Sequence, residues 1–242
     1  MKAIGARVRY LEQHLRSCLR KFDRDGGFSG PSVHFHERTM DLRRRLGCRR
    51  AIESDEFCEC LYATLTSWGM HRMGKTSAKL LDWREFCANI RAHARSIARL
   101  QELDICSLPN ADVKEVGAKL DALIQTLGVS EARTKLVSGS KTLHHLLPGL
   151  VPPIDREYTL RFFYGTKSPT RLDRRFPELF AGFTELARRQ RSLLEGRITG
   201  LGFHTSLTKE MDNAIVGARL LEKDFDGAVK ALPKPSRRKR TN

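Results

Sequence analysis

One lysine and one aspartate in the segment 139–165, GSKTLHHLLPGLVPPIDREYTLRFFYG, could together do chemistry. Lys141 opens a short helical stretch that Pro148 stops, and a double proline then delivers Asp155 to the start of a second helix. A fixed carboxylate in a water-poor cleft can stabilise developing positive charge or activate an attacking water. A lysine that is partly neutral can attack as a nucleophile. The segment therefore predicts a cation and a carboxylate held at the starts of two adjacent helices.

Both residues also have plainer roles. An aspartate directly before a helix is a favoured N-cap, because it accepts hydrogen bonds from amides of the first turn. Capping is compatible with catalysis, since it also fixes the direction of the carboxylate. Lys141 could equally be a phosphate ligand or a solvated lysine at a helix start, and the residues alone leave these alternatives open.

The turn Gly139-Ser140-Lys141-Thr142, followed by Pro153-Ile154-Asp155, resembles the helix-hairpin-helix (HhH-GPD-like) DNA glycosylase superfamily. In that family a Gly-x-Lys-Thr turn opens a helix, and a Pro-x-Asp turn places the catalytic aspartate. The run LVSGSK at 136–141 lacks the family's second glycine and the apolar residue before the lysine, and the gap to Asp155 is shorter than usual by about one helical turn. The resemblance implies that Asp155 acts in cleavage of an N-glycosidic bond. It also implies that Lys141 matches the lysine with which some members form a Schiff base.

The resemblance further implies a fold of two helical lobes with the active site in the cleft between them. Mapped onto this chain, residues 50–160 form a central lobe with the hairpin-like turn. Residues 1–49 and 161–231 form the second lobe from both chain ends. The basic residues 232–242, LPKPSRRKRTN, are expected to follow as a disordered tail.

Several residues near Lys141 and Asp155 are candidates for contacts with DNA. Small residues before a helix let backbone N–H groups approach a phosphate, and the helix dipole favours the anion. Histidines one turn beyond Lys141 could hydrogen-bond a flipped base or a phosphate. The alternatives are an ordinary helix entry and satisfied structural histidines. The predicted DNA contacts are Ser138, Gly139, Ser140, His144, His145, Arg156 and Arg161.

A second cluster of side chains could hold a base. An enzyme that acts on a base in DNA must rotate it out of the stack and hold it against aromatic or apolar surfaces. The irregular connection after a helix at 53–67 and an aromatic residue before Gly165 offer such surfaces, although core packing is the alternative for each. The predicted base pocket comprises Trp68, Met70, His71, Arg72 and Tyr164.

The chain is strongly basic: 44 Lys and Arg against 28 Asp and Glu give a formal charge of +16. Such an excess indicates a polyanionic partner, because a cationic surface gains affinity by releasing counterions from phosphates. The resemblance to helix-hairpin-helix glycosylases then implies a DNA glycosylase that flips a damaged or modified base out of duplex DNA, in base-excision repair or in defence against phage DNA with modified bases. The alternatives are a non-enzymatic basic helical protein that binds DNA or RNA and, ranked lower, an all-α protein that binds other proteins.

Apolar residues recur at three- and four-residue steps, which predicts an all-α protein with helices at 2–22, 36–46, 53–67, 83–103, 111–127, 176–196 and 207–229. No apolar run is long enough to span a membrane, and the start lacks a signal-peptide core, so we expect a cytoplasmic monomer with reduced cysteines. The H-x-H at 34–36 and the C-x-C at 58–60 lack a second pair at zinc-finger spacing. We therefore expect no metal and no other cofactor.

Overall fold

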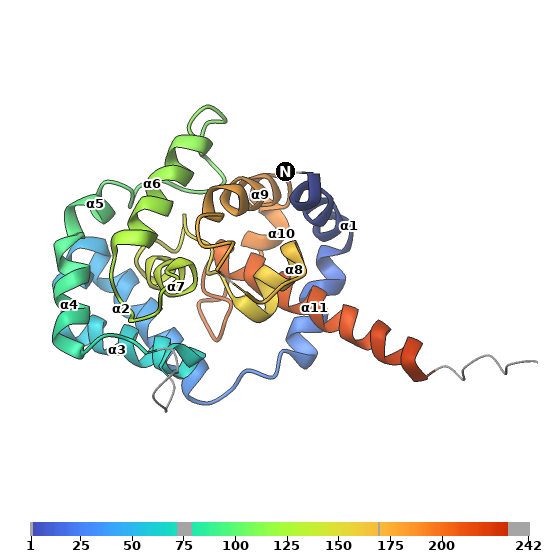
Figure 1. The fold of residues 1–242 in the computed structure, drawn as a ribbon, viewed down its shortest axis with the longest axis horizontal. Helices are drawn as coiled ribbons and strands as arrows, with labels where there is room; N and C mark the ends of the chain where they lie inside the picture. Colours follow the sequence, from blue (N-terminus) through green and yellow to red (C-terminus); the bar gives the residue numbers. More distant parts are fainter. Residues whose placement is uncertain (1, 72–78, 169, 232–242) are drawn as a thin grey trace, which may run out of the picture.

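The chain folds into helices joined by loops (Figure 1). The computed structural model describes residues 2–71, 79–168 and 170–231. Within these ranges there is no β-strand, and an isolated antiparallel bridge pairs Leu80 with Ser130. The predicted all-α class is confirmed. Across the described part of the chain, no helix combines the length and the apolar character needed to cross a bilayer.

Every helix that the apolar spacing predicts is present, and two of them are broken into shorter pieces. The predicted helix at 83–103 is divided into α4 and α5, and the one at 176–196 into α9 and α10. The described elements are α1 (Lys2–Asp25), α2 (Pro31–Glu53), α3 (Asp55–Leu65), the π-helical turn η1 (Thr66–Met70), α4 (Trp83–Ala92), α5 (Ala94–Ala98), α6 (Val113–Thr126), α7 (Leu136–Leu146), the π-helical turn η2 (Arg156–Leu160), α8 (Arg161–Tyr164), α9 (Phe176–Arg189), α10 (Arg191–Glu195) and α11 (Leu207–Ala231).

Helix α1 buries the apolar face that its sequence spacing predicts. Ile4, Val8, Leu11, Leu15 and Leu19 are each at most 6% exposed. The helix packs against α8, α9 and α11, so the first and the last helix of the described chain lie side by side (Figure 1). Removal of this apolar face from water is the main stabilising contribution of such a helix.

Helices α1 and α11 cross at very short distance at Gly217. A Cβ atom built at this position would lie 1.8 Å from the carbonyl oxygen of Cys18. A backbone atom cannot move aside as a flexible side chain can, so the crossing requires a residue without a side chain.

We expect Gly217→Ala to lower the free energy of unfolding by about 3 kcal/mol, because the added methyl group forces the two helices apart. Urea denaturation measures this change. Gly5→Ala in α1 is the matched control, since its methyl group would meet only the end of the Arg9 side chain, at 3.6 Å. This control should be neutral or stabilising by up to about 1 kcal/mol. A Gly217→Ala protein as stable as the wild type would contradict the close crossing.

Helices α1, α8, α9 and α11 form one packing group, and helices α2, α3 and α7 form a second. α2 packs on α3, α4, α5 and α7, and α7 also packs on α6. α6 in turn packs on α9 and thereby joins the two groups. α2 spans the predicted lobe boundary between residues 49 and 50, and the division into lobes stays a prediction.

All six cysteines carry free thiols, which agrees with the reduced state that the sequence predicts. Cys18, Cys48, Cys58 and Cys87 are buried within the helical core, while the other two are partly exposed. Burial raises the pKa of the Cys18 thiol to about 11, so this group stays protonated and unreactive at neutral pH.

Candidate active-site pocket

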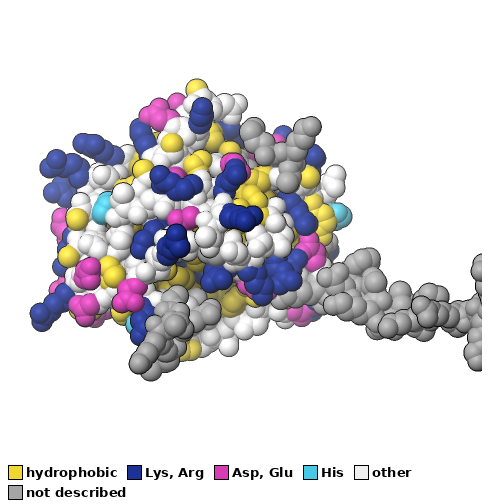
Figure 2. Space-filling model, in the orientation of Figure 1, with side chains coloured by type: hydrophobic (Ala, Val, Ile, Leu, Met, Phe, Trp, Pro, Cys, Tyr) yellow, Lys and Arg dark blue, Asp and Glu magenta, His cyan; other side chains and the backbone are white. Residues whose placement is uncertain are grey.

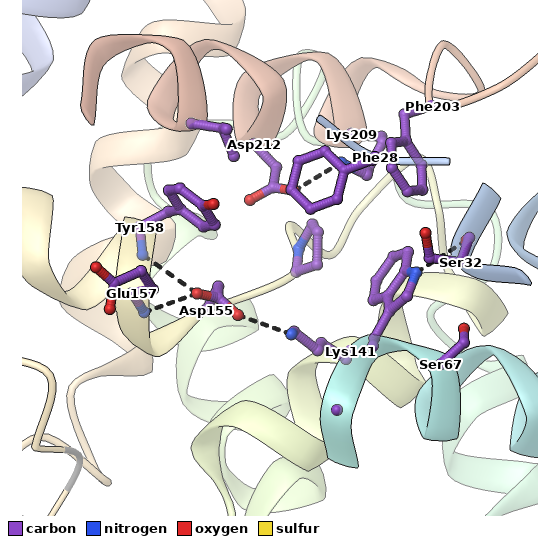
Figure 3. A pocket seen from close by; sticks show the side chains of 14 residues that line it. Phe28, Ser32, Ser67, Lys141, Asp155, Glu157, Tyr158, Phe203, Lys209 and Asp212 are labelled. Atoms are coloured by element: carbon purple, nitrogen blue, oxygen red, sulfur yellow. Dashed lines mark hydrogen bonds and ion pairs between the residues drawn. The ribbon is translucent and has the colours of Figure 1, made fainter. Parts of the chain in front are cut away.

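Lys141 and Asp155 meet in the structure. The Lys141 ammonium donates a hydrogen bond to Oδ2 of Asp155 at 2.9 Å. The other carboxylate oxygen, Oδ1, accepts from the backbone N–H groups of Glu157 at 2.7 Å and Tyr158 at 3.2 Å, which makes Asp155 the N-cap of η2 (Figure 3). The predicted N-cap is therefore confirmed. The three hydrogen bonds fix the direction of the carboxylate on both of its oxygens.

The surroundings of Asp155 favour its ionised form. Burial by itself raises the pKa of the carboxyl group. The charge and hydrogen bond of Lys141 and the two backbone N–H groups outweigh this effect, so the pKa lies below its ordinary value. The Asp155 side chain is 28% exposed and that of Lys141 is 7% exposed, so the carboxylate is the more accessible partner of the pair.

The pair faces a cavity of about 410 Å³, which lies within the usual range for small-molecule sites. Aromatic rings from four separate segments form much of its wall (Figure 3). Such a wall can hold a flat, unsaturated ring by stacking. The lining residues are Phe28, Ser32, Ser67, Trp68, Gly69, Lys141, Pro153, Asp155, Glu157, Tyr158, Phe203, Lys209, Asp212 and Val216.

A second lysine–aspartate pair, which sequence reasoning missed, lines the same cavity from α11. The ammonium of Lys209 donates to Oδ2 of Asp212 at 2.7 Å and to Oδ1 of Asn213 at 2.6 Å. It also lies 4.5 Å from the centre of the Phe203 ring and 5.9 Å from that of Trp68. In the sequence this pair is an ordinary i, i+3 spacing in a helix, typical of a solvated surface. Only the fold reveals that it is buried.

The predicted phosphate-binding turn is wrong. α7 begins at Leu136, so Ser138, Gly139 and Ser140 lie inside the helix and are buried, and Lys141 lies in its middle. The backbone N–H of Gly139, for example, is not open to a phosphate, because it donates to the carbonyl of Lys135.

These small residues serve packing and positioning. A Cβ atom at Gly139 would lie 2.7 Å from the carbonyl oxygen of Ile124, so glycine permits close contact between α7 and α6. The Ser140 hydroxyl accepts a hydrogen bond from the backbone N–H of Ile154 at 3.1 Å. Ser140 thereby anchors the segment that carries Asp155.

His144 and His145 are fully buried, so the prediction that they contact DNA is wrong. His145 donates from Nδ1 to the carbonyl of Lys141, and its Nε2 accepts from Nδ1 of His36 at 3.0 Å. Nε2 of His36 then accepts from the hydroxyl of Thr205 at 2.9 Å. In this assignment every imidazole of the relay is neutral. The relay supports Trp68, whose ring lies 5.2 Å from that of His36 and 5.1 Å from that of His145.

These histidines predict a loss of stability in mild acid. Burial is the main reason why the pKa values of His36 and His144 lie far below the ordinary value and that of His145 is about 4. The histidines of the unfolded chain bind protons near pH 6.5 and those of the folded chain do not. The free energy of unfolding is therefore highest above pH 6.5 and falls as the pH falls toward 4.

We expect the free energy of unfolding to fall by up to about 4 kcal/mol per pH unit over part of this window, because three sites protonate only on unfolding. Urea denaturation at pH 7.5, 6.0 and 5.0 measures the slope. His34→Gln, which removes an exposed imidazole on α2, should leave the slope unchanged, whereas His145→Gln should reduce it. A wild-type protein equally stable at pH 7.5 and 5.0 would contradict the buried neutral cluster.

The remaining predicted site residues divide between the pocket and other places. Trp68 lines the pocket and donates from its indole N–H to the carbonyl of Ser32 at 3.1 Å. Met70 is buried, and neither it nor His71 lines the cavity. The predicted Arg72 lies outside the described residues.

Tyr164, a predicted residue of the base pocket, does not line the cavity. Its hydroxyl lies 3.5 Å from Glu178 instead, and burial raises its pKa. Arg156 is exposed beside Asp155 and donates to the carbonyl of Lys167, while Arg161 forms an ion pair with Glu157 at 3.3 Å. Arg156 belongs to η2 and Arg161 to α8, and neither lines the cavity.

The chain was compared with protein-family models, curated proteins and solved structures, and none of these comparisons gave a match.

Proposed function

We propose that this protein is a DNA glycosylase, which takes a damaged or modified base out of duplex DNA and cleaves its N-glycosidic bond. The observation that carries the proposal is the fixed Asp155 carboxylate, paired with Lys141 at the wall of an aromatic cavity. A flipped base needs a flat apolar pocket. The sugar attached to that base needs a carboxylate at the pocket wall, which stabilises its developing positive charge. This site offers both.

Hydrolytic release of a base breaks the bond between C1′ of the sugar and a nitrogen of the base. The electron pair of that bond leaves with the base, which then takes up a proton from water. The oxygen of a second water molecule bonds to C1′, and Asp155 accepts the proton that this water loses. Asp155 then passes this proton to the hydroxide that the first water left, which restores the carboxylate. Before that attack, the negative charge of Asp155 stabilises the positive charge that develops on the sugar. Hydrogen bonding leaves lone-pair capacity on the carboxylate for this role.

The cavity walls suit an extruded base. Trp68, Tyr158, Phe28 and Phe203 come from different segments of the chain and surround one space. Stacking on such rings contributes about 1–3 kcal/mol per base. These segments belong to both of the lobes that the resemblance to helix-hairpin-helix glycosylases implies, which supports a cleft between two lobes as part of the proposal.

The distribution of charge is compatible with duplex DNA as the partner. Figure 2 shows Lys and Arg side chains spread over one face of the molecule and interspersed with fewer Asp and Glu side chains. The formal charge of +16 belongs to the whole sequence, including the basic residues 232–242. A spread cationic surface binds the phosphate backbone without regard to sequence and lets the pocket select the base.

Incubation of the full-length protein with duplexes that each carry one modified base, and with phage genomes that contain modified bases, tests the proposal. Alkali then cleaves any abasic site, and strand breaks are counted. We expect breaks at the position of at least one modified base and none in unmodified DNA. A protein that binds every duplex with strong salt dependence but releases no base would be the non-enzymatic DNA- or RNA-binding alternative.

A further inference from the structure

The Lys209–Asp212 pair presents a donor and an acceptor side by side at the wall of the pocket. Lys209 and Asp212 are held by α11, and both line the cavity (Figure 3). Their side chains are only 4% and 12% exposed, so water has little access to them and cannot readily replace the hydrogen bonds of a ligand at this wall. A buried ion pair of this kind is expensive to maintain, and it is often neutral or unfavourable for stability compared with apolar residues. Its place at the cavity indicates a role in recognising what enters.

Both groups keep unused hydrogen-bonding capacity. The Lys209 ammonium has three N–H protons, and among the described residues two acceptors are bonded to it, Asp212 and Asn213. The Oδ1 atom of Asp212 has no hydrogen-bond partner in the described part of the chain, since its bond to Lys209 uses Oδ2. One donor and one acceptor therefore remain for a ligand.

Nucleobases differ in the polarity of the edge that such a pair would meet. Uracil, thymine, hypoxanthine and guanine carry a carbonyl oxygen next to a ring N–H, which is an acceptor beside a donor. Cytosine and adenine carry an amino group next to an unprotonated ring nitrogen, which is the reverse order. A site built to pair with one order leaves its own buried groups unsatisfied when it meets the other, and this penalty gives strong discrimination.

We propose that Lys209 and Asp212 select keto bases over amino bases, with Lys209 donating to the carbonyl oxygen and Asp212 accepting from the adjacent ring N–H. This inference rests on the proposed glycosylase function and narrows its substrate class. The substrates would be keto bases such as uracil, hypoxanthine, oxidised guanine and substituted uracils.

The same contacts would assist the departure of the base. A base that leaves with the electron pair of the glycosidic bond carries negative charge, which in a keto base is shared with the carbonyl oxygen. The ammonium of Lys209 next to that oxygen stabilises this charge in the transition state. An amino base offers no oxygen at this position. The pair therefore favours keto bases both in binding and in the rate of release.

The test uses pairs of duplexes that differ only in this edge: uracil against cytosine, and hypoxanthine against adenine, with a matched set for oxidised and 5-substituted bases. Base release is measured at single turnover. Affinity is measured separately on duplexes with 2′-fluoro sugars, which resist cleavage. We expect at least one keto member to be released about 100-fold faster than its amino partner and to bind more tightly. Asp212→Asn should reduce this preference about tenfold or more, whereas Asp112→Asn, which changes an exposed aspartate before α6, should keep it.

The outcomes separate the two proposals. Release of bases without preference for the keto member, or with preference for the amino member, would overturn the selection by Lys209 and Asp212 and leave the glycosylase function standing. Tighter binding of keto members without release of any base would support the selection and overturn the glycosylase function. An Asp212→Asn protein that folds, as judged by circular dichroism, and keeps the full preference would remove Asp212 from recognition.

Discussion

Asp155→Asn is expected to reduce the single-turnover rate of base release by about 100- to 1,000-fold and to leave the affinity for duplex DNA nearly unchanged. The carboxylate acts on positive charge that exists only near the transition state, so the bound ground state loses little when the charge is removed. Asparagine is a good N-cap and can still accept from Lys141, so the fold should survive with a loss of about 2 kcal/mol in stability.

Rapid-quench measurement of base release, alongside equilibrium binding, separates these effects. Asp112→Asn is the control for a loss of negative charge at an exposed position, and it should release base at the wild-type rate. An Asp155→Asn protein that retains the wild-type rate would remove Asp155 from the mechanism. A variant that does not fold would show that the main role of Asp155 is that of a structural cap.

Local features of the sequence were sufficient to predict the helices and the direction of Asp155. Amphipathic spacing such as that of α1 reports burial directly, because a helix repeats its faces every three to four residues. The capping role of Asp155 depends only on the residues that follow it along the chain. The contact between Lys141 and Asp155 could also be predicted from the sequence, since only fourteen positions separate them.

Other parts of the site depend on contacts between distant segments and could not be predicted in this way. Ser138, Gly139 and Ser140 have the composition of a turn, yet they lie inside α7, where Gly139 permits close contact with α6. The charges of Lys209 and Asp212 are typical of a solvated helix face, and their burial depends on how α11 packs against the rest of the molecule. Tertiary packing here outweighs local propensity.

The last prediction concerns the role of Lys141. Its ammonium donates to Asp155, and the side chain is only 7% exposed. A lysine that attacks C1′ needs a free lone pair on Nζ, and an ammonium engaged with a carboxylate has none. We therefore expect the wild-type protein to release bases by hydrolysis and to form no covalent adduct with DNA when borohydride is added.

Lys141→Gln should then lower the rate of base release about tenfold, because Asp155 loses the cation that holds Oδ2. Lys119→Gln, at an exposed lysine of α6, controls for the loss of one positive charge and should behave as the wild type. A borohydride-trapped adduct that forms with the wild type and is absent from Lys141→Gln would overturn the hydrolytic mechanism and make Lys141 the nucleophile. An adduct that persists in Lys141→Gln and disappears in Lys209→Gln would also overturn it, because the attacking amine would then be the second lysine of the pocket.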